Sequence, residues 1–141
     1  ERVPVLAWLL EDAINGATVS GHDQVREAAG RMTVRHEDSR YLDVPPGDVI
    51  YLDPMFPERK KTAAVKKEAV ILQHLAYPED DAEALWEWAW QQPVRRIVVK
   101  RPLRAPVLGG QKPSHALAGK SIRFDVFVRQ YDDLNPSQTG E

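Results

Sequence analysis

Residues 48–57 read DVIYLDPMFP and set the strongest limit on the fold. Positions 49–52 are an apolar run of β-branched and aromatic side chains, which is typical of a strand buried on both faces. Asp53 and Pro54 then end the run, because a proline fixes the backbone and has no N–H to donate to a sheet. The pattern predicts a parallel strand with a carboxylate at its C-terminal end.

A strand end of this kind is a candidate ligand site, because open parallel sheets bind ligands just beyond the carboxyl ends of their strands. Asp53 offers a carboxylate, Pro54 a rigidly held carbonyl and Phe56 an aromatic face. Together these groups suit a flat base that bears an amino group. The alternative interpretation is a strand followed by a proline-rich turn with no further role.

Helical and strand patterns alternate along the rest of the chain. Apolar residues at helical spacing predict helices at 5–14, 23–29, 65–75 and 80–91. Asn15-Gly16 is expected to end the first helix and Asp23 to cap the second. Strands are expected at 32–36, 49–52, 96–100 and 121–129. This order favours an α/β fold with a mostly parallel sheet. The segment 102–119 is expected to be irregular, and Trp86 and Trp90, four residues apart on one helix face, to pack in the core.

The composition limits the function classes. With 141 residues, 43% of them apolar and 28% charged, the chain has the size of one globular domain. Its net charge of −2 provides no global basic field for nucleic acid, so such binding would need a local patch. The absence of cysteine excludes disulfides and thiolate metal sites. No apolar run reaches the roughly 20 residues that span a bilayer, so we expect a cytoplasmic protein without a membrane partner.

Other reactive chemistry has weak candidates. The four histidines lack recognisable metal-ligand spacing, so no metal site is expected. No serine occurs in a nucleophile-elbow setting, which leaves nucleophilic catalysis without a candidate.

A basic cluster follows the proposed base site, with five basic residues within nine positions: Arg59, Lys60, Lys61, Lys66 and Lys67. Such a cluster could contact RNA phosphates, and the alternative is a solvated loop. Lys100 and Arg101, at the end of the strand 96–100, are weaker candidates for the same contact, with a surface ion pair as the alternative. Three strand ends should thus carry Asp38-Ser39, Asp53 and Lys100-Arg101 to one edge of the sheet.

Several separated motifs carry a family resemblance, namely YLDPMFPERKK, VKKE, VVKRP and GKSIRFDVF, in that order. DPMFP resembles the Asp-Pro-Pro-Tyr type motif of S-adenosylmethionine (SAM)-dependent amino-methyltransferases, with Met55 in place of the second proline. The wider set is similar to the RsmJ-type methyltransferases, which act on guanine N2 in 16S ribosomal RNA. The similarity runs from Glu1 to about Gln130.

The resemblance implies a Rossmann-like class I methyltransferase sheet, mostly parallel with an antiparallel strand near the C-terminus. It implies SAM as cofactor, and 16S ribosomal RNA or the small ribosomal subunit as partner. Glu1 and Arg2 would contact the cofactor ribose, Asp38 and Ser39 would lie near the adenine, and Asp53 would sit at the methyl-transfer site, in contact with both cofactor and base.

The family places a glycine-rich cofactor loop upstream of the position of Glu1, and this chain contains no G-x-G. Residues 1–131 are therefore expected to be the C-terminal part of the methyltransferase domain, followed by a polar tail at 132–141.

The residues also suggest a mechanism of their own. Asp53 and the Pro54 carbonyl could accept hydrogen bonds from the two N–H groups of a guanine amine while Phe56 stacks on the base. Two alternatives stay open: an amino-methyltransferase acting on DNA or a protein amide, and a non-catalytic α/β module that binds a nucleotide or RNA.

Overall fold

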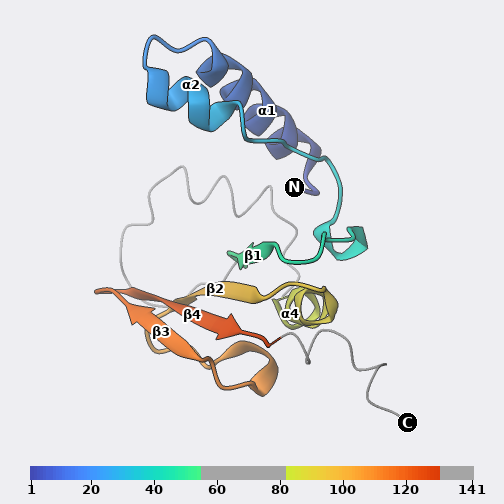
Figure 1. The fold of residues 1–141 in the computed structure, drawn as a ribbon, viewed down its shortest axis with the longest axis vertical. Helices are drawn as coiled ribbons and strands as arrows, with labels where there is room; N and C mark the ends of the chain where they lie inside the picture. The colour runs from blue at the N-terminus through green and yellow to red at the C-terminus, as the bar shows by residue number, and fades with distance from the viewer. Residues whose placement is uncertain (55–81, 131–141) are drawn as a thin grey trace. The chain divides into compact units, whose positions relative to one another are not determined.

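The computed structural model describes residues 1–54 and 82–130 (Figure 1). Within these ranges the chain forms two compact units, which are described separately: residues 1–41, and residues 42–54 together with 82–130. The expected helix at 65–75, the basic cluster at 59–67 and the tail at 132–141 lie outside the described residues.

The first unit contains two helices that lie side by side, α1 (Pro4–Thr18) and α2 (Asp23–Ala29) (Figure 1). Pro4 occupies the first turn of α1, where its missing N–H leaves no intrahelical bond unmade. The helix continues past Gly16, where the sequence predicted its end. Gly16 is not among the glycines with positive φ, so it does not turn the chain. The helix ends at Thr18, and the N–H of Val19, the next residue, donates to the Gly16 carbonyl.

Helix α2 has the predicted bounds, but the predicted cap is wrong. His22 occupies the N-cap position and makes no side-chain cap hydrogen bond. Asp23 lies in the first turn and pairs with Arg26 on the next turn, so its carboxylate faces along the helix rather than over the free N–H groups.

The segment expected as a strand at 32–36 is extended but carries no assigned strand. This segment forms backbone hydrogen bonds with Glu1. The backbone nitrogen of Glu1 donates to the Arg35 carbonyl at 3.0 Å, and the Glu37 N–H donates to the Glu1 carbonyl at 3.1 Å. In a parallel strand pair, one residue forms hydrogen bonds to the two residues on either side of the residue opposite it, as Glu1 does here with Arg35 and Glu37. The 3₁₀ helix η1 (Ser39–Tyr41) follows.

The second unit is built on a four-stranded sheet with the order β1-β2-β4-β3 (Figure 1). Its strands are β1 (Val49–Leu52), β2 (Arg96–Pro102), β3 (His115–Ala118) and β4 (Ile122–Val128). β1 pairs with β2 in parallel, and β4 is antiparallel to both β2 and β3. β3 therefore points the same way as β1 and β2, which confirms the predicted sheet with one antiparallel strand near the C-terminus.

The prediction that β1 is buried on both faces is wrong. Ile50 and Leu52 are 7% and 5% exposed, whereas Val49 and Tyr51 are 55% and 54% exposed. Helix α4 (Ala82–Gln91) packs its apolar residues against the face that carries Ile50 and Leu52. The alternate side chains of β1 therefore lie on an open face of this unit.

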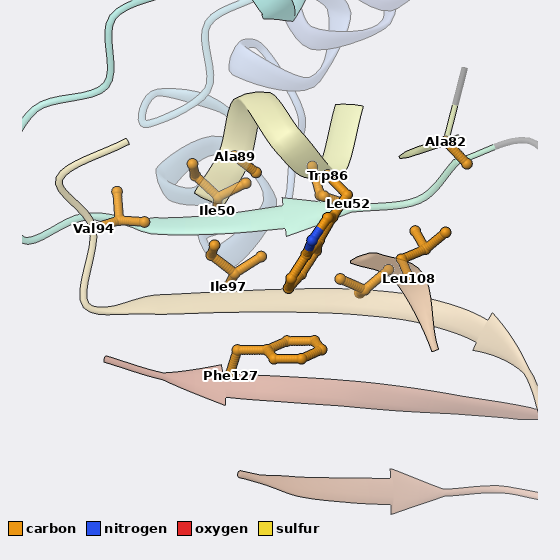
Figure 2. Close-up of a cluster of buried hydrophobic side chains, with 10 residues drawn as sticks. Ile50, Leu52, Ala82, Trp86, Ala89, Val94, Ile97, Leu108 and Phe127 are labelled. Carbon is orange, nitrogen blue, oxygen red and sulfur yellow. The ribbon is translucent and has the colours of Figure 1, made fainter. Parts of the chain in front are cut away.

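Trp86 of α4 lies in the core (Figure 2), and Trp90 packs against it, as predicted. Trp86 is 3% exposed and stacks on Trp90 with ring centroids 5.2 Å apart. Figure 2 shows Trp86 reaching from the helix toward Phe127 of β4, and these two ring centroids are 4.5 Å apart. None of the described helices is long and apolar enough to cross a membrane.

Strand β3 lies inside the segment that the sequence predicted to be irregular. All four of its residues are exposed, and it is held by its ladder to β4. Its sequence, HALA, has no β-branched residue and no apolar alternation, so the strand forms because β4 offers a free edge and not because of its own propensity.

Helix α4 also fixes the approach to β1. The Trp88 indole N–H donates to the Leu42 carbonyl at 3.0 Å, and the Val44 N–H donates to Oε1 of Gln92 at 3.1 Å. Gly47 turns the chain with φ of 90°, and its N–H reaches the Pro93 carbonyl. These contacts set where β1 begins and hence where its last residue points.

Candidate active site

Asp53, which directly follows β1, meets Lys100, which lies in the last part of β2. The parallel register pairs Leu52 with Val99, so the next residue of each strand lies beside that of the other. Nζ of Lys100 donates to Oδ2 of Asp53 at 2.8 Å. The two side chains are 33% and 46% exposed, so the pair lies at the surface and is open to a ligand. The structure thus confirms that these two predicted site residues share one edge.

The ion pair favours the protonated form of Lys100. The hydrogen bond to Asp53 is the main cause of a raised pKa at the Lys100 ammonium, and the negative charge of Asp53 acts in the same direction, while partial burial opposes both. Lys100 therefore stays protonated at neutral pH. Pro54, which follows the carboxylate, is buried and limits how far the chain can move there.

Two aromatic side chains lie on the same face of the sheet and were not singled out from the sequence. Tyr51 precedes Asp53 by two residues, and its ring centroid is 6.4 Å from that of Phe124. The strand register places Phe124 opposite Lys100. The alternation of apolar and polar residues in β4 gave a signal for Phe124, whereas β1 is apolar throughout, so only the sheet order brings the two rings together.

Arg101 is buried and binds a loop carbonyl, which corrects the expectation that it contacts RNA phosphates. It is 6% exposed, and its Nε and Nη2 donate to the Pro106 carbonyl at 3.0 and 2.6 Å. The sequence predicted that the strand ends at Lys100, but β2 continues to Pro102. Because side chains alternate along a strand, Lys100 takes the open face and Arg101 the covered one.

Asp38 lies in the first unit, where Arg40 holds its carboxylate. Nε of Arg40 contacts both oxygens at 3.1 Å, and Nη2 lies 2.6 Å from Oδ2. The Arg40 backbone N–H also donates to Oδ1, and Nη1 of Arg2 lies 3.9 Å from Oδ2. The side-chain hydrogen bond to Arg40 is the main cause that lowers the pKa of Asp38 to about 2.

Arg2 and Asp38 are thus close within the first unit, Glu1 and Ser39 are their neighbours in the sequence, and the cofactor role of these four residues stays a prediction. Oε1 of Glu1 accepts the Val3 N–H at 2.8 Å, and in the part of the chain that the structure describes Oε2 accepts no hydrogen bond. Glu1 fits a ligand with hydroxyl groups, because its carboxylate is exposed and can accept. The Asp38 carboxylate is already occupied by Arg40, so an adenine amine would have to share it.

The remaining candidates lie outside the described residues. These are Phe56 and the basic residues Arg59, Lys60, Lys61, Lys66 and Lys67. Among residues 1–54 and 82–130, no three His, Asp or Glu side chains gather as the ligands of a metal ion would.

Comparisons with known proteins identify the family of the chain. A family described as putative SAM-dependent methyltransferases matches residues 1–129. Ribosomal RNA small subunit methyltransferase J of Hydrogenovibrio crunogenus is 44% identical over 132 residues, which cover 91% of this chain and 48% of the relative. The protein of the same name from Colwellia psychrerythraea is 45% identical over 133 residues, which cover 92% of this chain and 48% of the relative.

A solved structure is also similar. The crystal structure of a SAM-dependent methyltransferase from Neisseria gonorrhoeae superimposes with a TM-score of 0.65 at 29% identity, over 91% of this chain and 50% of that one. The chain thus spans about half the length of the curated relatives it matches.

Proposed function

We propose, because the chain belongs to the family of putative SAM-dependent methyltransferases, that the protein transfers a methyl group from SAM to the N2 amine of a guanine in 16S ribosomal RNA. The relatives support the substrate, since their names specify the RNA of the small ribosomal subunit. Guanine N2 is the finer part of the proposal and rests on the strand-end motif around Asp53. A cytoplasmic site of action goes with this substrate.

The observation that carries the proposal is the exposed carboxylate of Asp53, held at the carboxyl end of β1 and followed by the buried Pro54. A guanine amine is a weak nucleophile because its lone pair is delocalised into the ring. Two acceptors aimed at its N–H groups direct the lone pair outward and compensate the positive charge that develops on nitrogen. Asp53 and the Pro54 carbonyl provide these acceptors, and Phe56 provides the stacking face.

The bound cofactor supplies an electrophilic methyl group. Glu1 is the residue of the first unit best suited to hold it, since a carboxylate accepts from vicinal hydroxyls, with Arg2, Asp38 and Ser39 beside it. Arg40 holds the Asp38 carboxylate and the Tyr41 N–H donates to the Asp38 carbonyl, so the backbone N–H groups of Asp38 and Ser39 contact the adenine edge. The basic residues at 59–67 contact the RNA phosphates, because they follow the base site in a chain of slightly negative net charge.

The direct test is transfer of labelled methyl from SAM to naked 16S ribosomal RNA and to small ribosomal subunits, with the protein expressed from its complete gene. The labelled RNA is digested to nucleosides, and the product is identified by mass spectrometry. N2-methylguanosine is the expected product. Unlabelled RNA together with retained RNA binding would instead support the non-catalytic module, and label in DNA or in a protein amide would support the other amino-methyltransferases.

A further inference from the structure

The pair formed by Asp53 and Lys100 is built into the sheet. Both residues come directly after positions that pair in the parallel ladder, so the fold itself brings their side chains to one point. Nζ of Lys100 contacts Oδ2 at 2.8 Å. In the described part of the chain, Oδ1 of Asp53 accepts no hydrogen bond. One carboxylate oxygen is therefore held and the other is available.

A carboxylate at a strand end needs such a partner if it is to point in one direction. The last torsion of an aspartate side chain has a broad preference, so an unpartnered carboxylate samples many orientations. A hydrogen bond from a cation to one oxygen removes this freedom and also fixes the second oxygen, because the group is planar. The buried Pro54 holds the backbone on the other side of the same residue.

Stability does not account for the pair. Both side chains are partly exposed, and exposed ion pairs contribute little to folding because water and salt screen them. The neighbouring Arg101 shows the contrasting case, since it is buried and holds the loop through the Pro106 carbonyl.

We propose that Lys100 is a positioning residue for methyl transfer: it holds Oδ2 of Asp53 so that Oδ1 accepts the N–H of the amine that receives the methyl group. This inference rests on the proposed function. It replaces the earlier expectation that Lys100 contacts RNA phosphates.

Charge considerations agree with this arrangement. During the transfer the bond from sulfur to the methyl carbon breaks, the bond from nitrogen to that carbon forms, and positive charge moves from sulfur to nitrogen. The nitrogen then loses a proton to the solvent. An ammonium beside the nitrogen would oppose this change. With Lys100 on Oδ2 and the amine on Oδ1, the carboxylate stands between the two positive groups.

The test uses the protein expressed from its complete gene, with single-turnover methyl transfer at saturating SAM and RNA. Lys100→Met removes the charge and the donor at similar length, and it should slow transfer by roughly 10-fold or more. Lys100→Arg keeps a cationic donor and should stay within about 3-fold of wild type. Lys112→Met is the matched control, because Lys112 is exposed and precedes β3 at the opposite edge of the sheet, and its transfer rate should not change.

RNA affinity and its salt dependence separate positioning from phosphate binding. A positioning residue leaves both unchanged in Lys100→Met, whereas a phosphate contact lowers the affinity and flattens the salt slope. A flattened slope with an unchanged saturated rate therefore overturns the inference.

A double-mutant cycle shows whether Lys100 acts through Asp53. In the Asp53→Ala background, Lys100→Met should change the rate by less than about 2-fold, because the group to be positioned is gone. The same loss in both backgrounds overturns the inference while leaving the proposed function in place. If the wild-type protein transfers no methyl group to the RNA or the subunit, the proposed function fails, and the inference fails with it.

Discussion

Asp53 combines two tasks in the proposed reaction, because its geometry orients the amine and its charge compensates the developing cation. Asp53→Ala removes both. Transfer should then fall by roughly 100-fold or more, or about 3 kcal/mol, as it does when an oxyanion-hole donor is lost. Asp53→Asn keeps an acceptor oxygen without the charge and should fall between wild type and alanine. Single-turnover rates at saturating SAM and RNA check both values.

Thermal melts of the same variants provide the control for folding. Asp53 is 46% exposed, so its loss should change the melting temperature little. Near-normal turnover in a folded Asp53→Ala protein would remove the catalytic role, and a large drop in melting temperature would favour the proline-turn alternative.

Asp38 links the stability of the first unit to pH. Its pKa is lowered from 3.8 to about 2, so the ionised carboxylate stabilises the folded state above pH 4, and this contribution is lost as the pH falls toward 2. The side chain is 18% exposed, and screening keeps the contribution to no more than about 2 kcal/mol. Asp38→Asn should therefore lower stability at pH 7 and show a flatter decline between pH 4 and 2.

Urea denaturation at a series of pH values measures this effect. Asp48→Asn is the matched control, since it makes the same chemical change at an exposed position. If Asp38→Asn and Asp48→Asn give the same pH profile, the contacts of Arg40 do not contribute to stability.

At the scale of elements, the 3₁₀ helix η2 (Leu108–Gly110) packs against α4 at a position that only glycine can occupy. Gly109 has φ of 64°, its N–H donates to Oε2 of Glu83 at 2.9 Å, and a Cβ there would overlap the Trp86 indole. Trp86 is in the core and cannot move aside freely. Gly109→Ala should lower the free energy of unfolding by about 3 kcal/mol or more, measured by urea denaturation.

Gly110 provides the control within the same element. It has the same φ of 64°, and a Cβ there would meet no atom within 4 Å. Gly110→Ala should therefore show the backbone effect alone, about 1 kcal/mol. Equal losses in the two variants would show that the Trp86 contact adds nothing.

The prediction of helices and strands succeeded where a local sequence pattern was strong, and it failed where pairing with a distant segment decided the structure. Strand 49–52 and helix 23–29 have the predicted bounds, since apolar runs and helical spacing are properties of the sequence itself. Apolar and polar residues alternate in β4, yet the polar Asp125 is 1% exposed and accepts hydrogen bonds from Arg123 at 2.8 and 3.0 Å. Arg123 also donates to the Leu103 carbonyl, and only the folded loop provides that acceptor.

At the scale of the whole molecule, RNA binding must come from local charge, because the net charge is −2. Replacing Lys60 and Lys61 together with alanine should lower RNA affinity and reduce the slope of log affinity against log salt by about 1 to 2. Binding titrations at several salt concentrations measure both quantities.

The control makes the same change of charge at two exposed residues near the amino ends of β2 and β3. Arg96 begins β2 and Lys112 precedes β3, and both are exposed. Their double alanine variant should keep the wild-type salt slope. An unchanged slope in the Lys60 and Lys61 variant would instead mean that the basic cluster is only solvated.

The sequence alone determined the class of fold, the strand that precedes Asp53 and the place of Trp86 in the core, because each depends on neighbours a few residues apart. It also predicted that Asp53 and Lys100 share an edge, since parallel strands end on the same side. The tertiary structure decided what these residues do there. The register of β1 and β2 places Lys100 beside Asp53. Because β2 continues past Lys100, the side chain of Arg101 is buried, and pairing with the edge of β4 makes residues 115–118 a strand. Pairing and register depend on contacts between distant segments, which local spacing does not contain.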